Sequence, residues 1–183
     1  MQQVVFDVPY TEERNRGTTA IRVILAIPHL LLLQAWQGVT QVGALIQWFI
    51  CLFTGKRSKG IWDLSYMEES YGSRVYSYVL LSHDVFPGFL TDPGKVPSTY
   101  SLEYDESVNR LTSGLRLIWV IPALIIAALL AIAAFFVGII SWFAIWFTGK
   151  QPRGMFDFMV KSLRYILQTS AYLYLLTDTY PKF

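Results

Sequence analysis

The side chains that most often carry chemistry are few in this chain. Cys51 is the only cysteine and lies inside an apolar stretch, where a small buried hydrophobe is the usual interpretation. His29 and His83 are the only histidines. Asp84 and Asp178 each stand shortly before an aromatic–Pro pair, a context typical of a turn or cap. No nucleophile–base arrangement and no paired catalytic acid can be proposed, so the sequence predicts no enzyme, no catalytic residue, no cofactor and no metal.

The most regularly spaced polar residues belong to two similar phrases, FTGKRSKG at 53–60 and FTGKQPRG at 147–154. Neither phrase has the GxxxxGK[ST] frame of a nucleotide-binding loop. Two interpretations remain: the glycine ends a helix and the lysine anchors it at a membrane interface, or the basic groups bind anionic lipid headgroups. Tryptophans before each phrase suit an aromatic belt. The predicted anchoring residues are Arg22, Trp48, Lys56, Arg57, Lys59, Arg116, Trp142, Trp146, Lys150 and Arg153.

Both phrases belong to a duplication that covers nearly the whole chain. A shift of 94 positions aligns the two halves without an insertion, down to their ends, HDVFPGF (83–89) and TDTYPKF (177–183). We therefore predict two repeats, residues 1–90 and 99–183, joined by the polar linker TDPGKVPS (91–98). Neither histidine matches a histidine in the other repeat, so a symmetric haem or metal site would lack ligands.

Each repeat contains one long apolar block, roughly 20–53 and 111–147, followed by a polar and aromatic helix at about 61–82 and 155–177. The chain is 54% hydrophobic and only 15% charged, against about 25% charged residues in average soluble domains. These features predict a membrane protein. Because one membrane span needs about 20 residues, each block is either a single helix kinked at its proline, with its first turns in the headgroups, or a helical hairpin.

Charge placement favours the hairpin, because Lys and Arg flank both ends of each block and prefer the cytoplasmic face. The stretch AALLAIAAFF (127–136) has no helix breaker, which argues against it. The predicted fold class is an all-α integral membrane protein with two tandem repeats. Each repeat has a strand-like segment (4–8 or 100–104), a hairpin or re-entrant pair, and an amphipathic interfacial helix. The small residues expected to allow close helix packing are Ala127, Ala131, Ala134 and Gly138.

The second repeat strongly resembles a family of small bacterial membrane proteins known only as a domain of unknown function. The residues that carry the resemblance are NRLTSGLRLIWVIP, WFAIWFTGKQPRGMFDF and LLTDTYPKF. It covers 106–183 and, more loosely, 12–89, where Ser58-Lys59 replaces Pro152-Arg153. The resemblance implies a location in the bacterial inner membrane and adds no catalytic residue. The polar, acidic start of the chain lacks the features of a cleaved signal, so we expect a cytoplasmic N-terminus.

Two functions are compatible with these observations. The first is a non-catalytic integral membrane subunit that scaffolds or stabilises a larger membrane complex. Its expected partners are membrane lipids, anionic ones above all, and other integral membrane subunits or a second copy of itself, but no nucleic acid. The alternative is a small transporter or channel with a pathway at the repeat interface, lined by Gln34, Gln37, Gln41 and Gln47. In either case we expect a pseudo-twofold axis near the membrane normal.

Overall fold

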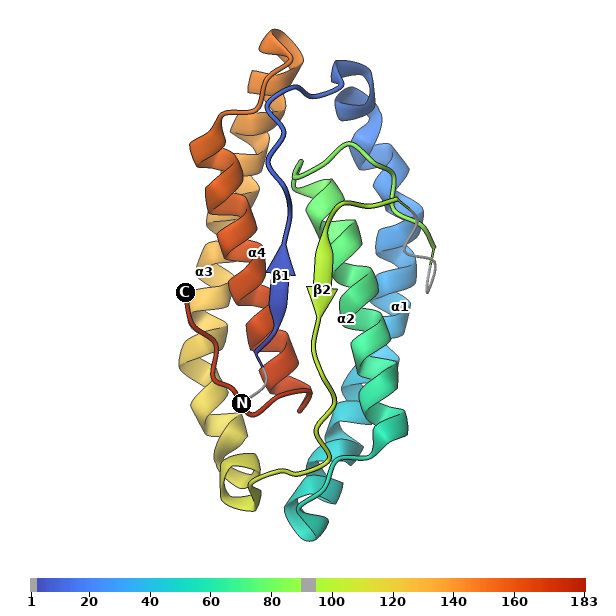
Figure 1. Cartoon of the computed structure of the whole chain (residues 1–183), viewed down its shortest axis with the longest axis vertical. Coiled ribbons are helices and arrows are strands. Elements are labelled where there is room, and N and C mark those ends of the chain that lie inside the picture. The colour runs from blue at the N-terminus through green and yellow to red at the C-terminus, as the bar shows by residue number, and fades with distance from the viewer. Residues whose placement is uncertain (1–2, 90–94) are drawn as a thin grey trace.

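The structure, a computed structural model, describes residues 3–89 and 95–183. In this part of the chain the elements follow the order β1, α1, α2, β2, α3, α4, so each repeat contributes one short strand and two helices (Figure 1). Residues 91–94 of the predicted linker lie outside the described residues. The remaining linker residues, 95–98, have no regular secondary structure.

Each apolar block folds into one uninterrupted helix. Helix α1 comprises Arg16–Thr54 and α3 comprises Arg110–Thr148, 39 residues each. The hairpin prediction is therefore wrong. Pro28 and Pro122 each remove one backbone donor, but the Leu, Ile and Ala residues around them favour the helix strongly enough to continue it. By length and composition, both helices are long and apolar enough to cross a membrane.

The ends of the long helices follow from local sequence. Asn15 caps α1 by accepting a hydrogen bond from the Thr18 N–H over 3.1 Å, and Asn109 caps α3 in the same way. Gly55 and Gly149 close the helices at φ +74° and +75°, a left-handed conformation that glycine adopts without steric cost. The prediction of a glycine stop is confirmed.

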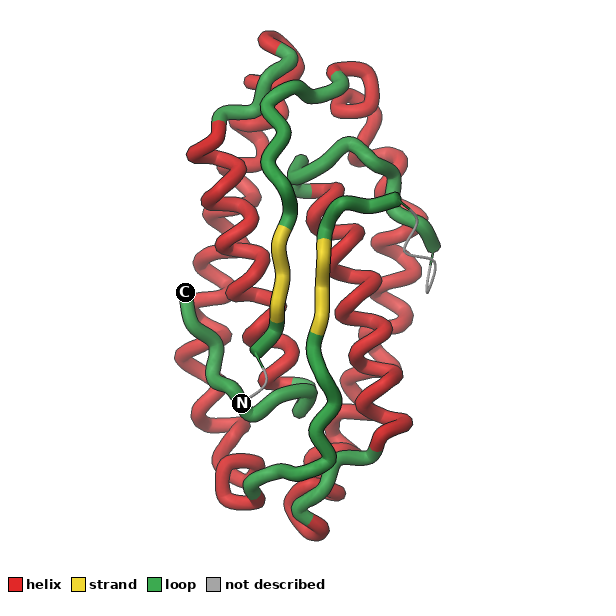
Figure 2. The backbone as a smooth tube through the Cα atoms, viewed as in Figure 1, coloured by secondary structure: helices red, strands yellow, loops and turns green. Residues whose placement is uncertain are grey.

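The shorter helices α2 (Lys59–Val79) and α4 (Arg153–Leu173) form a layer beneath α1 and α3. The strands β1 (Val5–Asp7) and β2 (Thr99–Ser101) form an antiparallel pair on the far side of that layer (Figure 2). Each strand packs on a helix of the other repeat: β1 of the first repeat packs on α4, and β2 of the second repeat packs on α2. The two repeats are thus interlocked and do not form two separate folding units.

The apolar face of α4 is buried inside the protein. Phe156, Leu163 and Leu167 pack in one cluster with Phe6 and Val8, which arrive from the other repeat. Helix α2 is also mostly buried. The prediction that these helices lay their apolar faces in a membrane interface is therefore wrong. Amphipathicity alone does not distinguish a lipid-facing helix from one that is covered by protein.

A pseudo-twofold axis relates the repeats and runs perpendicular to the long helices. In the strand pair, Phe6 lies opposite its own repeat equivalent, Tyr100. The Trp48 indole donates to the Ser113 carbonyl over 2.8 Å, and Trp142 makes the equivalent bond to Thr19 over 2.8 Å. Helices α1 and α3 are therefore antiparallel. The basic turns after them lie at opposite ends of the molecule, not at one end as a hairpin would require.

Candidate functional site

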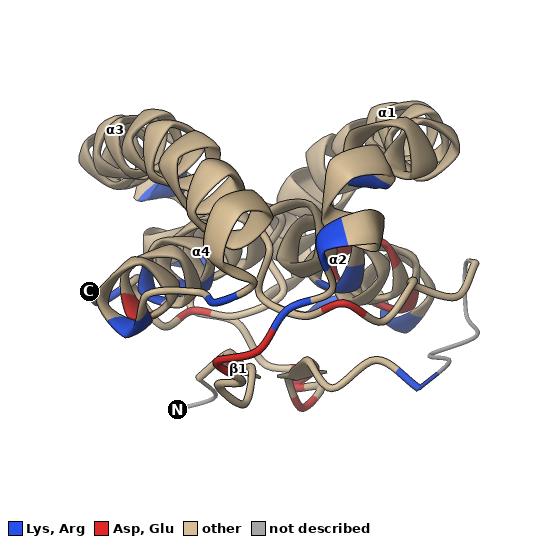
Figure 3. Ribbon diagram, turned by 90° about the horizontal axis from the view of Figure 1, so that it is seen from above, with Lys and Arg blue, Asp and Glu red and all other residues tan. Residues whose placement is uncertain are grey.

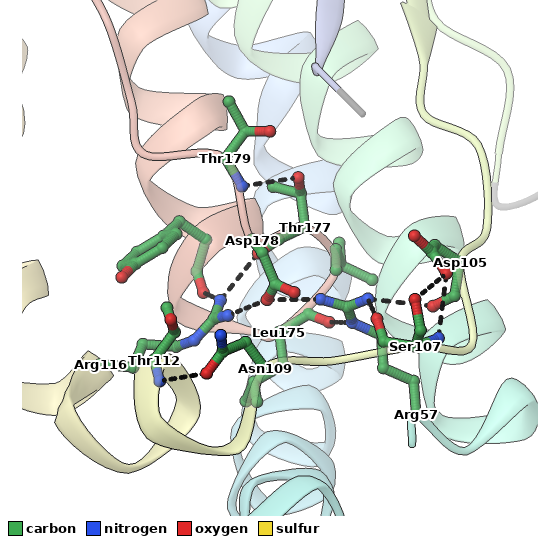
Figure 4. A network of polar contacts seen from close by, with 12 residues as sticks. Arg57, Asp105, Ser107, Asn109, Thr112, Arg116, Leu175, Thr177, Asp178 and Thr179 are labelled. Atoms are coloured by element: carbon green, nitrogen blue, oxygen red, sulfur yellow. Dashed lines mark hydrogen bonds and ion pairs between the residues drawn. The ribbon is translucent and has the colours of Figure 1, made fainter. Parts of the chain in front are cut away.

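Arg22 and Arg116 lie inside the protein and pair with aspartates of the loops that follow α2 and α4. Arg22 forms an ion pair with Asp84, and Arg116 forms the equivalent pair with Asp178. Asp178 also accepts a 2.6 Å hydrogen bond from Arg57, which belongs to the other repeat (Figure 4). The guanidinium groups additionally donate to carbonyls of these loops. Arg22 and Arg116 thus bind the loops to the long helices, and Arg57 binds the loop after α4 to the segment between α1 and α2.

This burial corrects three predicted headgroup anchors. Arg22, Arg57 and Arg116 are only 2%, 4% and 0% exposed. A buried guanidinium is tolerated when a carboxylate compensates its charge and carbonyls accept from its donors. These loops supply both to the Nη groups of Arg22 and Arg116, whereas the Nε atoms of these two arginines have no hydrogen-bond partner among the described residues. Trp48 and Trp142, also predicted as anchors, are partly buried and join α1 to α3. Their role in the structure is to hold the two repeats together.

The other predicted anchors remain at the surface. Lys56 pairs with Glu106 and Lys150 with Glu12, each at 3.0 Å. Because both pairs are exposed, their contribution to stability is small. A role in binding lipid headgroups stays a prediction for the exposed residues Lys56, Lys59, Trp146, Lys150 and Arg153.

The strip of small residues on α3 is largely used inside the chain. Ala127 and Ala134 are 8% and 1% exposed. A Cβ added to Gly138 would lie 3.9 Å from the side chain of Leu80, the residue that follows α2. Ala131 is exposed and lines a cavity that opens at the surface. The buried residues of the strip are thus covered within this chain, where α3 packs on α1 and α4. Close packing of a further helix against the strip stays a prediction.

A cavity of about 350 Å³ lies where all four helices meet. We call it the central cavity. Its polar residues are contributed mainly by α2, and its apolar wall by α3 and α4. It is lined by Gln37, Glu68, Glu69, Gly72, Tyr76, Val79, Leu80, Ala131, Ala134, Phe135, Leu163, Ile166, Leu167 and Ser170.

Two adjacent glutamates of α2 reach the central cavity. Glu68 and Glu69 are each 5% exposed. Glu69 shares a hydrogen bond with Ser170, whereas Glu68 has no hydrogen-bond or ion-pair partner among residues 3–89 and 95–183. Burial raises the pKa of Glu68 to about 7. Burial, reinforced by the neighbouring Glu68 charge, raises the pKa of Glu69 to about 8. The pair is therefore largely protonated below pH 7.

Polar groups continue from this cavity along the repeat interface. The Tyr174 hydroxyl is hydrogen-bonded to the side chains of Gln37 and Gln41. Gln41 and Tyr174 also line a second cavity, of about 220 Å³, between α1, α3 and the end of α4. Of the four glutamines proposed for a pathway, Gln37 and Gln41 thus line cavities. Gln34 is exposed, and Gln47 accepts a 3.1 Å hydrogen bond from the Ser58 N–H.

The glutamates break the symmetry of the duplication, since Ser162 and Leu163 occupy the matching positions of α4. Glu68 and Glu69 are not among the functional residues that the sequence predicts. The mismatch between the repeats was the available signal, because a charged pair present in one copy alone has no role in the shared architecture. Among the described residues, no group of three or more His, Cys, Asp or Glu side chains could hold a metal ion.

Comparisons with known proteins give one result. A family model described as Domain of unknown function (DUF4389) matches residues 16–91 and again residues 110–183. The two matches begin 94 positions apart, the same offset as the internal repeat. No curated protein and no solved structure matches the chain. The family description supplies no activity, so a functional assignment rests on the geometry.

Proposed function

The chain belongs to the DUF4389 family and contains two copies of its domain. We propose that the two copies together perform one function. The protein is a non-catalytic integral membrane subunit that lies in one leaflet with α1 and α3 parallel to the membrane surface. It supports a larger membrane complex through contacts with lipids and with other membrane subunits.

One observation carries this proposal, namely the large number of apolar side chains exposed on α1 and α3. Among the described residues, 35 large hydrophobic side chains are exposed, eleven of them on α1 and seventeen on α3. Charged residues gather in the layers of α2, α4 and the strands (Figure 3). An apolar area of this extent marks a surface that meets a membrane or another protein.

The length of the helices favours an in-plane orientation. A 39-residue helix is about 58 Å long at 1.5 Å per residue, whereas the hydrocarbon core is about 30 Å thick. Fitting that length into the core would need a tilt of roughly 60°, beyond the usual limit of about 40°. A perpendicular orientation would also bring exposed charges of α4, such as Lys161, into hydrocarbon. In the in-plane orientation the pseudo-twofold axis lies along the membrane normal.

The same orientation gives the exposed basic residues a common role. Lys56 and Lys150 lie at opposite ends of the molecule, yet both sit beside the exit of a long helix from the apolar layer. In an in-plane arrangement both face the headgroups of one leaflet, where anionic lipids attract them. The cytoplasmic leaflet of the bacterial inner membrane fits this preference for basic groups.

Cysteine labelling tests the orientation. The variants Lys56→Cys and Lys150→Cys are expected to react with a membrane-impermeant maleimide from the same side of sealed vesicles. The native Cys51 is fully buried and should remain silent. Ser101→Cys on β2 should react from that side too, whereas Leu129→Cys on the apolar face should react only after detergent is added. Labelling of positions 56 and 150 from opposite sides would show that the helices span the membrane and would refute the in-plane proposal.

A second candidate, a small transporter or channel, is favoured by the two cavities that Gln37 and Gln41 line at the repeat interface. The titratable glutamates of the central cavity make proton flux the appropriate measurement. The scaffold role predicts that vesicles containing the protein acidify no faster than protein-free vesicles, as measured by a trapped pH-sensitive dye. Faster acidification that is lost in Gln37→Leu, but kept in the surface variant Gln34→Leu, would favour the transporter.

A further inference from the structure

The Glu68 carboxylate lines the central cavity and lacks a hydrogen-bond donor or a cation to pair with among the described residues. It is 5% exposed, it lines the cavity, and the described chain offers it no hydrogen-bond or ion-pair partner. A buried carboxylate without a partner is costly in either protonation state. Glu69 beside it is only partly satisfied by Ser170. A bound group that donates hydrogen bonds and carries positive charge would satisfy both acids.

The rest of the cavity restricts the kind of molecule that could carry this group. Apolar side chains of α3 and α4 form one wall, including Phe135, Leu163 and Ile166. No Lys or Arg lines the cavity, so a carboxylate or phosphate ligand would meet two acids without a balancing cation. The volume of about 350 Å³ is in the range of small-molecule sites. The chemistry is therefore that of an amphiphile with a cationic head and an apolar tail.

We propose that the central cavity binds a lipophilic amine, with its ammonium group between Glu68 and Glu69 and its apolar chain along α3 and α4. Ala131 and Phe135 of α3 line the cavity and are exposed on the apolar surface of the protein. The amine can therefore enter from the apolar surface of the protein.

Binding of a cation should be linked to release of protons from the two glutamates. The other titratable groups that face them are Tyr76 of α2, Tyr100 of β2 and Tyr174 after α4. Burial raises the pKa of each of these tyrosines above its ordinary value near 10, so they stay neutral. The residues of α1 and α3 that line the cavity are not titratable. Amine affinity should therefore rise with pH as the glutamates ionise.

The test compares dodecylamine with dodecanol, which has the same chain but no charge, on the purified full-length protein in a non-ionic detergent. Native mass spectrometry gives the stoichiometry and thermal unfolding gives the affinity. One dodecylamine per chain is expected at pH 8, bound at least tenfold more tightly than dodecanol. Release of one proton predicts a loss of about tenfold in affinity between pH 8 and pH 6. The measurement in detergent does not depend on how the protein lies in a membrane.

Two variants separate the head site from the apolar wall. Glu68→Gln keeps the shape of the side chain and should abolish the preference for the amine over the alcohol. Glu106→Gln, which changes an exposed acid outside the cavity, should not. Ala131→Phe should exclude both ligands, whereas Ala128→Phe, exposed on the same helix and outside the cavity lining, should exclude neither.

Three outcomes would overturn the proposal: equal binding of amine and alcohol, unchanged amine preference in Glu68→Gln, or tighter amine binding at pH 6 than at pH 8. A further arm identifies the source of the ammonium group. Competition by phosphatidylethanolamine but not by phosphatidylcholine would assign it to a membrane lipid. Failure of both to compete would assign it to a free amine, which the absence of a cation for the lipid phosphate predicts.

Discussion

Raising the pH from 6.5 to 9 is expected to lower the free energy of unfolding by about 3 kcal/mol, and the double variant Glu68→Gln/Glu69→Gln is expected to lose most of this dependence. The cause is the burial that raises the pKa of the two carboxyls to about 7 and about 8. In an unfolded chain both titrate near 4.3. The folded protein therefore binds more protons than the unfolded chain until both glutamates have ionised.

The sign follows from this difference in bound protons. The stabilising effect of the neutral carboxyls is complete below the unfolded pKa and is lost as pH rises through the folded pKa values. His83 acts in the opposite direction, because burial and the nearby Arg22 charge lower its pKa to about 4. That contribution raises stability between about pH 4 and pH 6.5 and then levels off. A pH range that starts at 6.5 excludes most of the His83 contribution, and the double variant identifies the part that is due to the glutamates.

Denaturant unfolding at several pH values measures the effect. Wild type and the double variant should differ most at pH 9, where the variant is the more stable protein, and should converge as pH falls. Glu106→Gln provides the matched control, since this acid is exposed and paired with Lys56. If the free energy of unfolding depended on pH in the same way for wild type and the double variant, the pKa values of the two carboxyls would not be raised in the folded protein, and the prediction would be wrong.

Features encoded by neighbouring residues could be predicted from the sequence. The duplication, the glycine stops at Gly55 and Gly149, and the strand-like character of 4–8 depend on short-range sequence patterns, and the structure contains all three. Alternation of Val4, Phe6 and Val8 buries one face of that segment. The sequence does not predict which helix this segment covers. β1 packs on α4, a helix of the other repeat, and this contact joins residues that are distant in the sequence.

Features that depend on contacts between distant residues could not be predicted. The hairpin was inferred from basic residues at both ends of each block, but Arg22 and Arg116 find carboxylates 62 positions away and leave the surface. The central cavity needs side chains from four helices, so neither glutamate could be placed beside Gln37 before the chain was folded. A positive charge in an apolar helix indicates either an interface or a buried partner, and the sequence does not decide between them.

The asymmetry of the two ion-pair sites leads to the last prediction: Asp178→Asn should destabilise the protein more than Asp84→Asn. Asp178 compensates two buried guanidinium groups, those of Arg57 and Arg116, whereas Asp84 pairs with Arg22 alone. Removing the Asp178 charge leaves two like charges unpaired inside the protein. Breaking such a pair costs about 3–5 kcal/mol when it is fully buried. Asp178 is 33% exposed, so we expect about 3 kcal/mol, and roughly half of that for Asp84→Asn.

A double-mutant cycle with Arg57→Gln separates electrostatic repulsion from lost hydrogen bonds. The repeat itself suggests this substitution, because Gln151 occupies the position that matches Arg57. If unpaired charge is the cause, Arg57→Gln combined with Asp178→Asn should cost less than the sum of the single changes, by about 1 kcal/mol or more. Unfolding in denaturant supplies all four free energies. Additive losses of stability, or equal losses for Asp84→Asn and Asp178→Asn, would contradict the prediction. Each carboxylate would then serve only as a hydrogen-bond acceptor, and the charge of the second arginine would not affect stability.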